Sequence, residues 1–409
     1  MPSREPIPEL VRSSKTGTSS CFILREPMPA ASDSYLLTTQ SGERRIFGDG
    51  PPAFSVRVPD LGFWEDLARR GTYAAAVAFI RARFDIEGDF LAAIRWWQRG
   101  HAGNARRRFV KALAWLRLES WHQSAARARR NIESHYDRSN AFYQQFLDRL
   151  MVYSCAYFAD PTWSLEEAQL AKLDRICSKL DLQATDRFLD VGCGWGGLVL
   201  HAAEQFGATA VGCTLSREQL AFANEQVHAR KLAPRVTIEG RDYRQMTGRF
   251  DKIASVGMYE HVGRRRLRAY FETLAHLLDP DGLVLNHGIV RPQTVGDDGT
   301  TEFLRHHVFP GGELPHLSDV VLSAEQAGFE VLDVENLRPH YALTCAAWVS
   351  RLQAHRDVCL ALVDETTYRT WLLYLAGSAV SFERGQTDIY QVLLARRSRR
   401  AARRLTRVG

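Results

Sequence analysis

The chain has 409 residues and a net charge of +6, with 45% hydrophobic and 24% charged residues. This composition is typical of a soluble globular protein, and the length favours two domains over one. No stretch approaches the roughly 18 apolar residues of a membrane-spanning helix, so the sequence predicts none. The seven cysteines include no C-x-x-C pair and the HExxH motif is absent, so we expect reduced thiols and no metal site.

The positive charge is concentrated in two segments. The last fourteen residues hold seven arginines and no acid, and residues 101–131 hold eight lysines and arginines against Glu119. Because the rest of the chain is net negative, these segments predict local contact with phosphates, such as an anionic membrane surface. For the last fourteen residues alone, a solvent-exposed tail that binds no phosphate is an equally good interpretation.

In chain order, residues 1–20 lack an apolar signal core and are predicted to form a disordered tail rather than an export signal. A Pro/Gly-rich joint at 47–54 and a mixed helical pattern after it predict a small N-terminal domain over 21–105. Residues 106–134 follow as a predicted basic linker helix that contains Trp121. Such a helix suits a membrane surface, and packing between two domains is the alternative.

Regular signals begin at Ser164 and Glu167, which form a predicted capping box. The helix that follows has an expected apolar stripe of Leu170, Leu173, Cys177 and Leu180. Strand and helix patterns then alternate, which predicts an α/β fold with five parallel strands and a terminal pair. This is the strand set of a nucleoside-binding methyltransferase, and an ordinary doubly wound domain is the alternative. The predicted strands are RFLDV (187–191), TAVGC (209–213), RVTIE (235–239), KIASV (252–256), GLVLN (282–286), FEVLDVENL (329–337) and DIYQVLLAR (388–396).

The stretch FLDVGCGWGG (188–197) joins the first of these strands to a helix through a glycine-rich turn. Such a turn lets backbone N–H groups approach a ligand closely at the carboxyl edge of the sheet. Gly192, Gly194 and Gly197 satisfy G-x-G-x-x-G, so a dinucleotide is one candidate ligand. Asp190 opposes that reading, because a carboxylate repels a pyrophosphate but suits the cationic amino-acid end of another ligand.

Two further segments bear on the choice of ligand. Thr214 to Ser216 follow the second strand without the acid that would bind a ribose diol, which is neutral between the candidates. Asp242 and Tyr243 follow the third strand and suit the amino group and the face of an adenine. Turn chemistry is the alternative for these residues, and Ser216 with Gln219 also reads as a capping box. Together with the resemblance below, the pattern favours S-adenosylmethionine (SAM).

Six motifs, in this order, resemble the cyclopropane-fatty-acid synthase family, which includes mycolic acid cyclopropane synthases: HYDRSNAFYQQFL, YSCAYF, LDVGCGWGG, LSREQ, MYEHVG and LRPHYALT. The resemblance runs from His135 to Arg396 and implies a catalytic domain over 135–396 with an Arg-rich tail at 397–409. It implies a class I SAM-dependent methyltransferase fold, Rossmann-like, with a mostly parallel seven-stranded sheet. The implied reaction adds a methylene across the cis double bond of an unsaturated phospholipid acyl chain.

The resemblance also implies two sets of site residues. The cofactor pocket would comprise Tyr153, Ser154, Asp190, Gly192, Cys193, Gly194, Trp195, Gly196, Gly197, Thr214, Leu215, Ser216, Gln219, Asp242 and Tyr243. The family's bicarbonate site is matched by Cys155, Glu260, His287, Ile289 and Tyr341.

The implied chemistry accounts for these residue types. An alkene is a weak nucleophile, so the methyl group must be held in line with the double bond in a dry pocket. Methyl transfer leaves a carbocation, which the rings of Tyr341 and Trp348 could stabilise. A bicarbonate held by Glu260 and His287 could then accept the proton whose loss closes the ring.

Each catalytic residue has a purely structural alternative when it is taken alone. Glu260 could pair with His261, His287 could be a core histidine, Cys155 a buried filler and Tyr341 a core aromatic. Their joint occurrence in the family's order favours the catalytic interpretation.

The sequence departs from the family's pattern in several places. Ser378 stands where many members have a cysteine, Gly288 where a threonine is expected, and Tyr259 where phenylalanine is usual. The N-terminal domain shows no clear copy of the glycine-rich motif of the phospholipid-acting members. These departures leave open whether the product is a cyclopropane or a methyl branch.

The interpretation is a cytoplasmic enzyme that docks on the inner face of the membrane and modifies phospholipid acyl chains. Relatives that make a methyl or methylene branch, or that methylate a small amine, supply the alternatives. A non-enzymatic nucleic-acid binder would rest on the arginine tail, but the chain shows no recognisable nucleic-acid module. The family resemblance also implies a homodimer.

Overall fold

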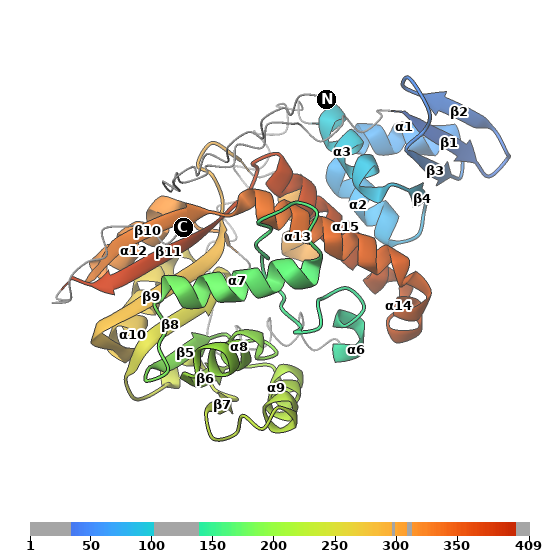
Figure 1. The fold of residues 1–409 in the computed structure, drawn as a ribbon. Helices are drawn as coiled ribbons and strands as arrows, with labels where there is room; N and C mark the ends of the chain where they lie inside the picture. The colour runs from blue at the N-terminus through green and yellow to red at the C-terminus, as the bar shows by residue number, and fades with distance from the viewer. Residues whose placement is uncertain (1–33, 102–138, 297–298, 309–312, 398–409) are drawn as a thin grey trace, which may run out of the picture.

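The computed structural model describes residues 34–101, 139–296, 299–308 and 313–397 (Figure 1). The predicted tail at 1–20, the basic linker helix at 106–134 and the arginine tail from residue 398 lie outside these residues. No helix in the described ranges combines the length and hydrophobicity that a membrane-spanning segment requires.

The N-terminal module, residues 34–101, combines a small sheet with three helices. Its strands are β1 (Tyr35–Thr39), β2 (Arg44–Phe47), β3 (Phe54–Val58) and β4 (Asp85–Gly88), in the order β2-β1-β3-β4. Its helices are α1 (Leu61–Arg70), α2 (Thr72–Ile80) and α3 (Phe90–His101). The sequence predicted only a mixed helical pattern after residue 54, and the structure shows that this region also contains the strands β3 and β4. The predicted domain boundaries at 21 and 105 remain predictions.

The large sheet has seven strands in the order β10-β11-β9-β8-β5-β6-β7. The five strands from β9 to β7 are parallel, and β11 runs antiparallel to both of its neighbours. This arrangement confirms the predicted fold class. The bounds are β5 (Arg187–Val191), β6 (Thr209–Cys213), β7 (Val236–Glu239), β8 (Phe250–Val256), β9 (Leu278–Val290), β10 (Phe329–Asn336) and β11 (Asp388–Arg396).

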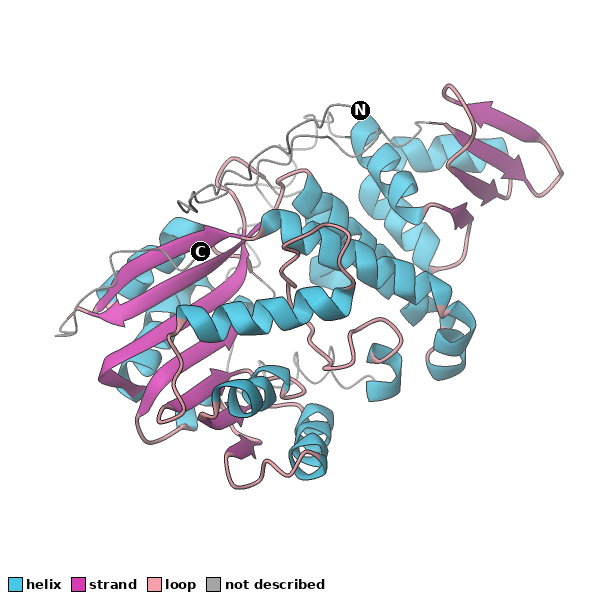
Figure 2. Cartoon of the chain, in the orientation of Figure 1, coloured by secondary structure: helices cyan, strands magenta, loops and turns pink. Residues whose placement is uncertain are grey.

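Helices cover both faces of this sheet (Figure 2). On one face lie α7 (Leu165–Lys179), α8 (Gly197–Phe206) and α9 (Arg217–Ala229), and on the other α10 (Leu267–Leu277) and α12 (Leu317–Gln326). Each face has its own apolar core, and the alternation along β5 sends Phe188 into one core and Leu189 into the other. Short 3-10 helices lie at η2 (Tyr243–Gln245), η3 (Tyr259–His261) and η4 (Arg264–Arg266).

A third core joins the N-terminal module to the rest of the chain. It is built with α6 (Asn140–Tyr143), α11 (Gly299–His307), α13 (Arg338–Ala354), α14 (Arg356–Leu362) and α15 (Glu365–Glu383). The helices α2 and α3 pack on α15, as Figure 1 shows. Phe79 and Phe90 of the module therefore belong to the same apolar cluster as Trp371.

The helix α7 confirms one local prediction and corrects another. Ser164 caps it and Glu167 returns the bond, so the capping box is present. Leu173, Cys177 and Leu180 are buried as predicted, but Leu170 is only half-buried. The polar residues Gln169 and Lys172 are buried instead, because Gln169 donates to the carbonyls of Val152 and Ser154 and Lys172 donates to Ser154 Oγ.

Candidate active site

The glycine turn begins where β5 ends and passes directly into α8. The N–H groups of Gly192 and Cys193 both donate to the carbonyl of Cys213 at 3.0 Å, which fixes the turn against β6. Gly194 has φ +56°, and a Cβ atom at this position would meet no other atom within 4 Å. The turn thus leaves open space beside its backbone, as a ligand-binding turn requires.

This space is part of a cavity of about 170 Å³, here called the cofactor cavity, at the carboxyl edge of the sheet. Every predicted cofactor residue lines it except Gly196 and Ser216. Gly196 packs instead towards Ala223, and Ser216 accepts a hydrogen bond from the N–H of Gln219 at the start of α9. Ser216 therefore caps the N-terminus of α9, as the structural alternative in the sequence analysis predicted.

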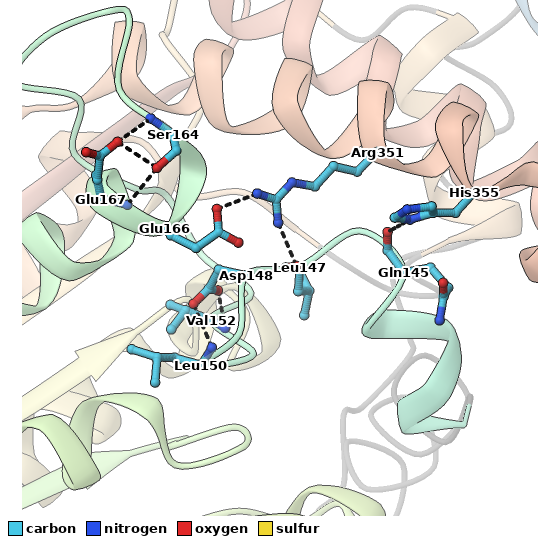
Figure 3. A network of polar contacts seen from close by, with 10 residues as sticks. All are labelled: Gln145, Leu147, Asp148, Leu150, Val152, Ser164, Glu166, Glu167, Arg351 and His355. Carbon is cyan, nitrogen blue, oxygen red and sulfur yellow. Dashed lines mark hydrogen bonds and ion pairs between the residues drawn. The ribbon is translucent and has the colours of Figure 1, made fainter.

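The loop of residues 145–155 contributes Met151, Val152, Tyr153 and Ser154 to the cavity wall. Figure 3 shows the polar contacts that hold this loop. Within it, Asp148 accepts hydrogen bonds from the N–H groups of Leu150 and Val152 at 2.9 and 2.8 Å. Arg351 of α13 donates to the carbonyl of Leu147 at 2.9 Å and pairs with Glu166 of α7. These bonds hold the loop between two helices and so position Tyr153, Ser154 and Cys155.

Two buried charged groups lie in the cavity wall. Asp190 is 3% exposed, and its Oδ1 has no hydrogen-bond partner within the described residues. Burial raises the pKa of this carboxyl to about 7, although Lys172 opposes the rise. Lys172 is 2% exposed and donates to Ser154 Oγ at 3.0 Å, and burial lowers its pKa to about 8.

The sequence analysis did not identify Lys172 as a site residue. A signal was present, because Lys172 falls beside Leu173 and on the same helical face as Ile176. A lysine on an otherwise buried face of a helix needs a polar partner or a cavity.

The predicted adenine contacts, Asp242 and Tyr243, also line the cavity. Asp242 accepts hydrogen bonds from Nε and Nη2 of Arg244 at 2.8 and 2.5 Å, so both carboxylate oxygens are engaged. Tyr243 also lines the cavity, and its ring meets Tyr270 edge-on at 5.7 Å. Their contact with an adenine remains a prediction.

Glu260 lies on η3 and His287 on β9, and these two elements are in contact. Glu260 Oε1 accepts the N–H of Ile289 at 2.8 Å, while its Oε2 is buried without a partner in the described residues. Burial raises the pKa of Glu260 to about 7. The neighbours Met258 and His261 line the cavity, so Glu260 is within one residue of the wall.

His287 is fully buried on β9, two residues before Ile289 and therefore on the same face of the strand. Its Nδ1 lies 3.3 Å from the amide nitrogen of Gln391, and its Nε2 has no partner in the described part of the chain. Burial lowers the pKa of this imidazole well below its ordinary value, so the ring is neutral near pH 7.

The remaining predicted catalytic residues belong to the neighbouring aromatic core. Tyr341 of α13 meets Trp348 edge-on at 6.0 Å, and Trp348 lies 5.1 Å from Tyr153 of the cavity wall. The thiol of Cys155 donates to the carbonyls of Ala156 and Leu337, and burial raises its pKa. Cys155 is thus a neutral thiol rather than a nucleophile.

Two departures from the family's pattern prove to be in contact. A Cβ atom at Gly288 would lie 2.2 Å from Cε1 of Tyr259, so the tyrosine ring occupies the space of a side chain at 288. The hydroxyl of Tyr259 donates to the carbonyl of Ile289 at 3.0 Å. Tyr259 therefore binds the carbonyl of Ile289, while Glu260 binds the N–H of Ile289.

The strand order, the glycine turn and the cavity at the carboxyl edge define a class I SAM-dependent methyltransferase. The model of the family described as mycolic acid cyclopropane synthetase matches residues 123–392. The chain therefore belongs to this family of SAM-dependent enzymes, which act on fatty acyl lipids.

Individual relatives agree with this assignment. The chain is 41% identical to a "Probable fatty acid methyltransferase" of Pseudomonas putida over 357 residues, which cover 85% of this chain and 88% of the relative. It is 37% identical to "Cyclopropane mycolic acid synthase 1" of Mycobacterium tuberculosis over 274 residues, 64% of this chain and 95% of the relative.

Solved structures show the same likeness. The mycolic acid cyclopropane synthase CmaA1 complexed with SAH and CTAB has 35% identity and a TM-score of 0.63, over 65% of this chain and 97% of that one. The cyclopropane synthase MmaA2 from Mycobacterium tuberculosis has 33% identity and a TM-score of 0.63, over 66% and 98%. The cofactor of this chain is accordingly SAM.

Proposed function

We propose that this enzyme transfers a methylene from SAM to the cis double bond of an unsaturated phospholipid acyl chain and so forms a cyclopropane. The observation that carries this proposal is that Glu260 Oε2 and His287 Nε2 are both buried without a partner in the described residues, on the contacting elements η3 and β9. Methyl transfer to an alkene leaves a carbocation, and closing the ring then releases a proton that an acceptor must take. Branching that restores a double bond also releases a proton, so the product distinguishes the two reactions.

The chemistry of these two residues suits a small oxyanion such as bicarbonate. The neutral His287 can donate Nε2–H, and Glu260, with a pKa of about 7, can in its ionised form accept the O–H of bicarbonate at Oε2, which a glutamine amide at this position cannot do. Bicarbonate, when bound, supplies the proton acceptor for ring closure. Glu260 and His287 would hold it, and the Glu260 bond to Ile289 N–H would fix the carboxyl group in the required orientation.

The aromatic core serves the earlier part of the reaction. Tyr153, Trp348 and Tyr341 form a continuous series of ring contacts that leads from the cofactor cavity into the core. Such surfaces stabilise a positive charge that develops on an acyl chain, and they exclude water that would trap it. The chain's own contribution to methyl transfer is therefore position and electrostatics.

A methyl-branching or methylene-branching reaction is the second candidate. It is favoured by the relative named a probable fatty acid methyltransferase and by the Tyr259–Gly288 contact beside the proposed base site. The retention of Glu260, His287 and Tyr341 favours a lipid over a small amine as the substrate.

The proposed function is tested by mass spectrometry of lipids from cells that express the wild type, Glu260→Gln or the control Glu272→Gln. Glu272 is a surface residue that pairs with Arg268. The wild type and the control should add one CH2 to unsaturated chains and make them resistant to ozone, whereas Glu260→Gln should not. Products that ozone still cleaves would replace cyclopropanation with branching, and unchanged lipids would exclude both.

We further propose that the enzyme works at the cytoplasmic face of the membrane and that its arginine tail assists docking. Each Lys or Arg near an anionic surface contributes about 1 kcal/mol. Deletion of 398–409 spares β11, which ends at Arg396. The deletion should lower turnover on anionic vesicles and leave SAM affinity unchanged; equal turnover would remove the tail from the proposal.

A further inference from the structure

Lys172 is a buried cation in the wall of the cofactor cavity. It lies on α7, is 2% exposed, and reaches Ser154 Oγ with its Nζ at 3.0 Å. An ammonium group carries three N–H donors, and Ser154 accepts one of them. A buried lysine is costly unless it meets an opposite charge, so the surroundings of Lys172 need to be accounted for.

The nearby acids do not form an ion pair with Lys172. Asp148 acts on it electrostatically, but its two oxygens accept the N–H groups of Leu150 and Val152. Asp190 also acts on it, and lines the same cavity with an unpartnered Oδ1. The thiols of Cys155 and Cys177 are neutral, because burial raises the pKa of each.

The cavity wall therefore presents one buried cation and one buried anion, neither of which is paired by a salt bridge within the described residues. The amino-acid end of SAM carries the complementary pair, an α-carboxylate and an α-ammonium. Ser154 strengthens the match, because an Oγ that accepts from an ammonium can still donate its own hydrogen to a carboxylate.

We propose that Lys172 is a cofactor-binding residue that receives the α-carboxylate of SAM, directly and through Ser154, while Asp190 receives the α-ammonium. The two residues together select the amino-acid end of the cofactor. Burial removes water from both side chains, and this desolvation lowers the pKa of Lys172 and raises the pKa of Asp190. A bound zwitterion offsets part of this cost.

The test compares two ligands on the full-length protein by titration calorimetry. S-adenosylhomocysteine has the amino-acid end, and 5′-methylthioadenosine has the same nucleoside and a thioether but lacks that end. Lys172→Met should weaken the binding of S-adenosylhomocysteine by about tenfold or more and leave 5′-methylthioadenosine unchanged. Lys172→Gln, which can still donate to Ser154, should show a loss of the same kind.

Lys179→Met is the matched control. Lys179 is buried on the same face of α7, two turns further along, but it pairs with Asp333 and Glu335 and does not line the cavity. Its loss should leave the affinity for both ligands unchanged, whatever it does to the melting temperature.

Equal losses for the two ligands in Lys172→Met would overturn the proposal, because they would indicate a general structural role. Unchanged affinities would overturn it as well. If neither Lys172 variant folds, the wild type decides: it should bind SAM more than tenfold tighter than decarboxylated SAM, and equal affinities would refute the assignment. None of these outcomes depends on the identity of the lipid substrate.

Discussion

Glu260 Oε2 and His287 Nε2 are buried without hydrogen-bond partners among the described residues. Leaving such an atom unpaired costs about 1–3 kcal/mol, so a stable fold seldom keeps one without a reason. The same residues have pKa values displaced by burial, Glu260 upward and His287 downward. The cost of the unpaired atoms and their displaced pKa values together support the proposal that a ligand completes this site.

Glu260 should make the stability of the protein depend on pH. Its pKa of about 7 in the folded state lies above the ordinary value of 4.5, so the folded state binds this proton more tightly than the unfolded state. The stabilisation is fully present below pH 4.5 and is lost as pH rises through 7.

We therefore expect the stability of the wild type, measured relative to Glu260→Gln, to fall by about 3 kcal/mol between pH 4.5 and pH 8. Urea denaturation of both proteins across this range measures the difference. Parallel curves at every pH would show that Glu260 is solvated in the folded state.

Gly288 and Tyr259 should behave as a coupled pair. Gly288→Ala places a Cβ atom against the buried ring of Tyr259 and should destabilise the protein by about 1–3 kcal/mol. Tyr259→Phe keeps the ring and loses the bond to the Ile289 carbonyl, at a cost of about 1 kcal/mol.

Tyr259→Ala removes the ring, so Gly288→Ala should cost much less in that background than in the wild type. Thermal denaturation of the two single variants and the double variant tests this coupling. Additive losses would mean that the ring is not confined by position 288.

The cofactor residues show what could be predicted at this scale. Asp190, Thr214 and Gln219 line the cavity as predicted, because they lie at or shortly after the ends of strands whose hydrophobic runs are plain in the sequence. Lys172 was missed, since it lies in a helix far from any motif and its role depends on the cavity. The contact of Tyr259 with Gly288 was also beyond prediction, because it joins two segments through packing alone.

At the scale of elements, the 145–155 loop is held to the helices by a few polar contacts (Figure 3). Arg351→Ala removes the donor to the Leu147 carbonyl and the partner of Glu166. We expect a loss of stability of about 1–2 kcal/mol and weaker binding of S-adenosylhomocysteine, because the loop carries Tyr153 and Ser154.

The control is Arg356→Ala, a nearby arginine whose partner Asp357 is fully exposed to solvent. Its effect should stay within about 0.5 kcal/mol, with unchanged ligand affinity. Equal effects of the two substitutions would contradict a specific role for Arg351.

Elements differed in how well the sequence predicted them. The predicted bounds of β5, β6 and β11 match the observed ones, because a short apolar stretch between turn residues is compatible with only one strand position. β9 extends from Leu278 to Val290, beyond its predicted 282–286, and this extension carries His287 and Ile289. In the N-terminal module, β3 and β4 are short and β4 is polar, so their pairing depends on contacts distant in the sequence.

For the whole molecule, the N-terminal module shares its apolar core with α13 and α15. Arg369 of α15 crosses this boundary: it donates to the carbonyls of Phe79 and Phe84 and pairs with Asp85. Arg369→Leu leaves these groups without a donor and should destabilise the protein by about 2 kcal/mol or more.

Limited proteolysis should then cleave between the module and the catalytic domain before the catalytic domain itself is degraded. Arg95→Leu is the matched control, because Arg95 bridges the same boundary to Glu383 at the surface and should cost less than about 1 kcal/mol. If Arg369→Leu were as stable as Arg95→Leu, the module would not depend on this buried contact.

The central claim is that the chain closes a cyclopropane ring on a lipid with a base site at Glu260 and His287. The direct measurement uses purified protein, SAM with a CD3 group and vesicles of an unsaturated anionic phospholipid, followed by mass spectrometry of the acyl chains before and after ozone treatment. We predict that the wild type adds CD2, because ring closure removes one deuteron, and that the product resists ozone, while Glu260→Gln makes none. A product that ozone cleaves, or one that keeps all three deuterons, would contradict the account.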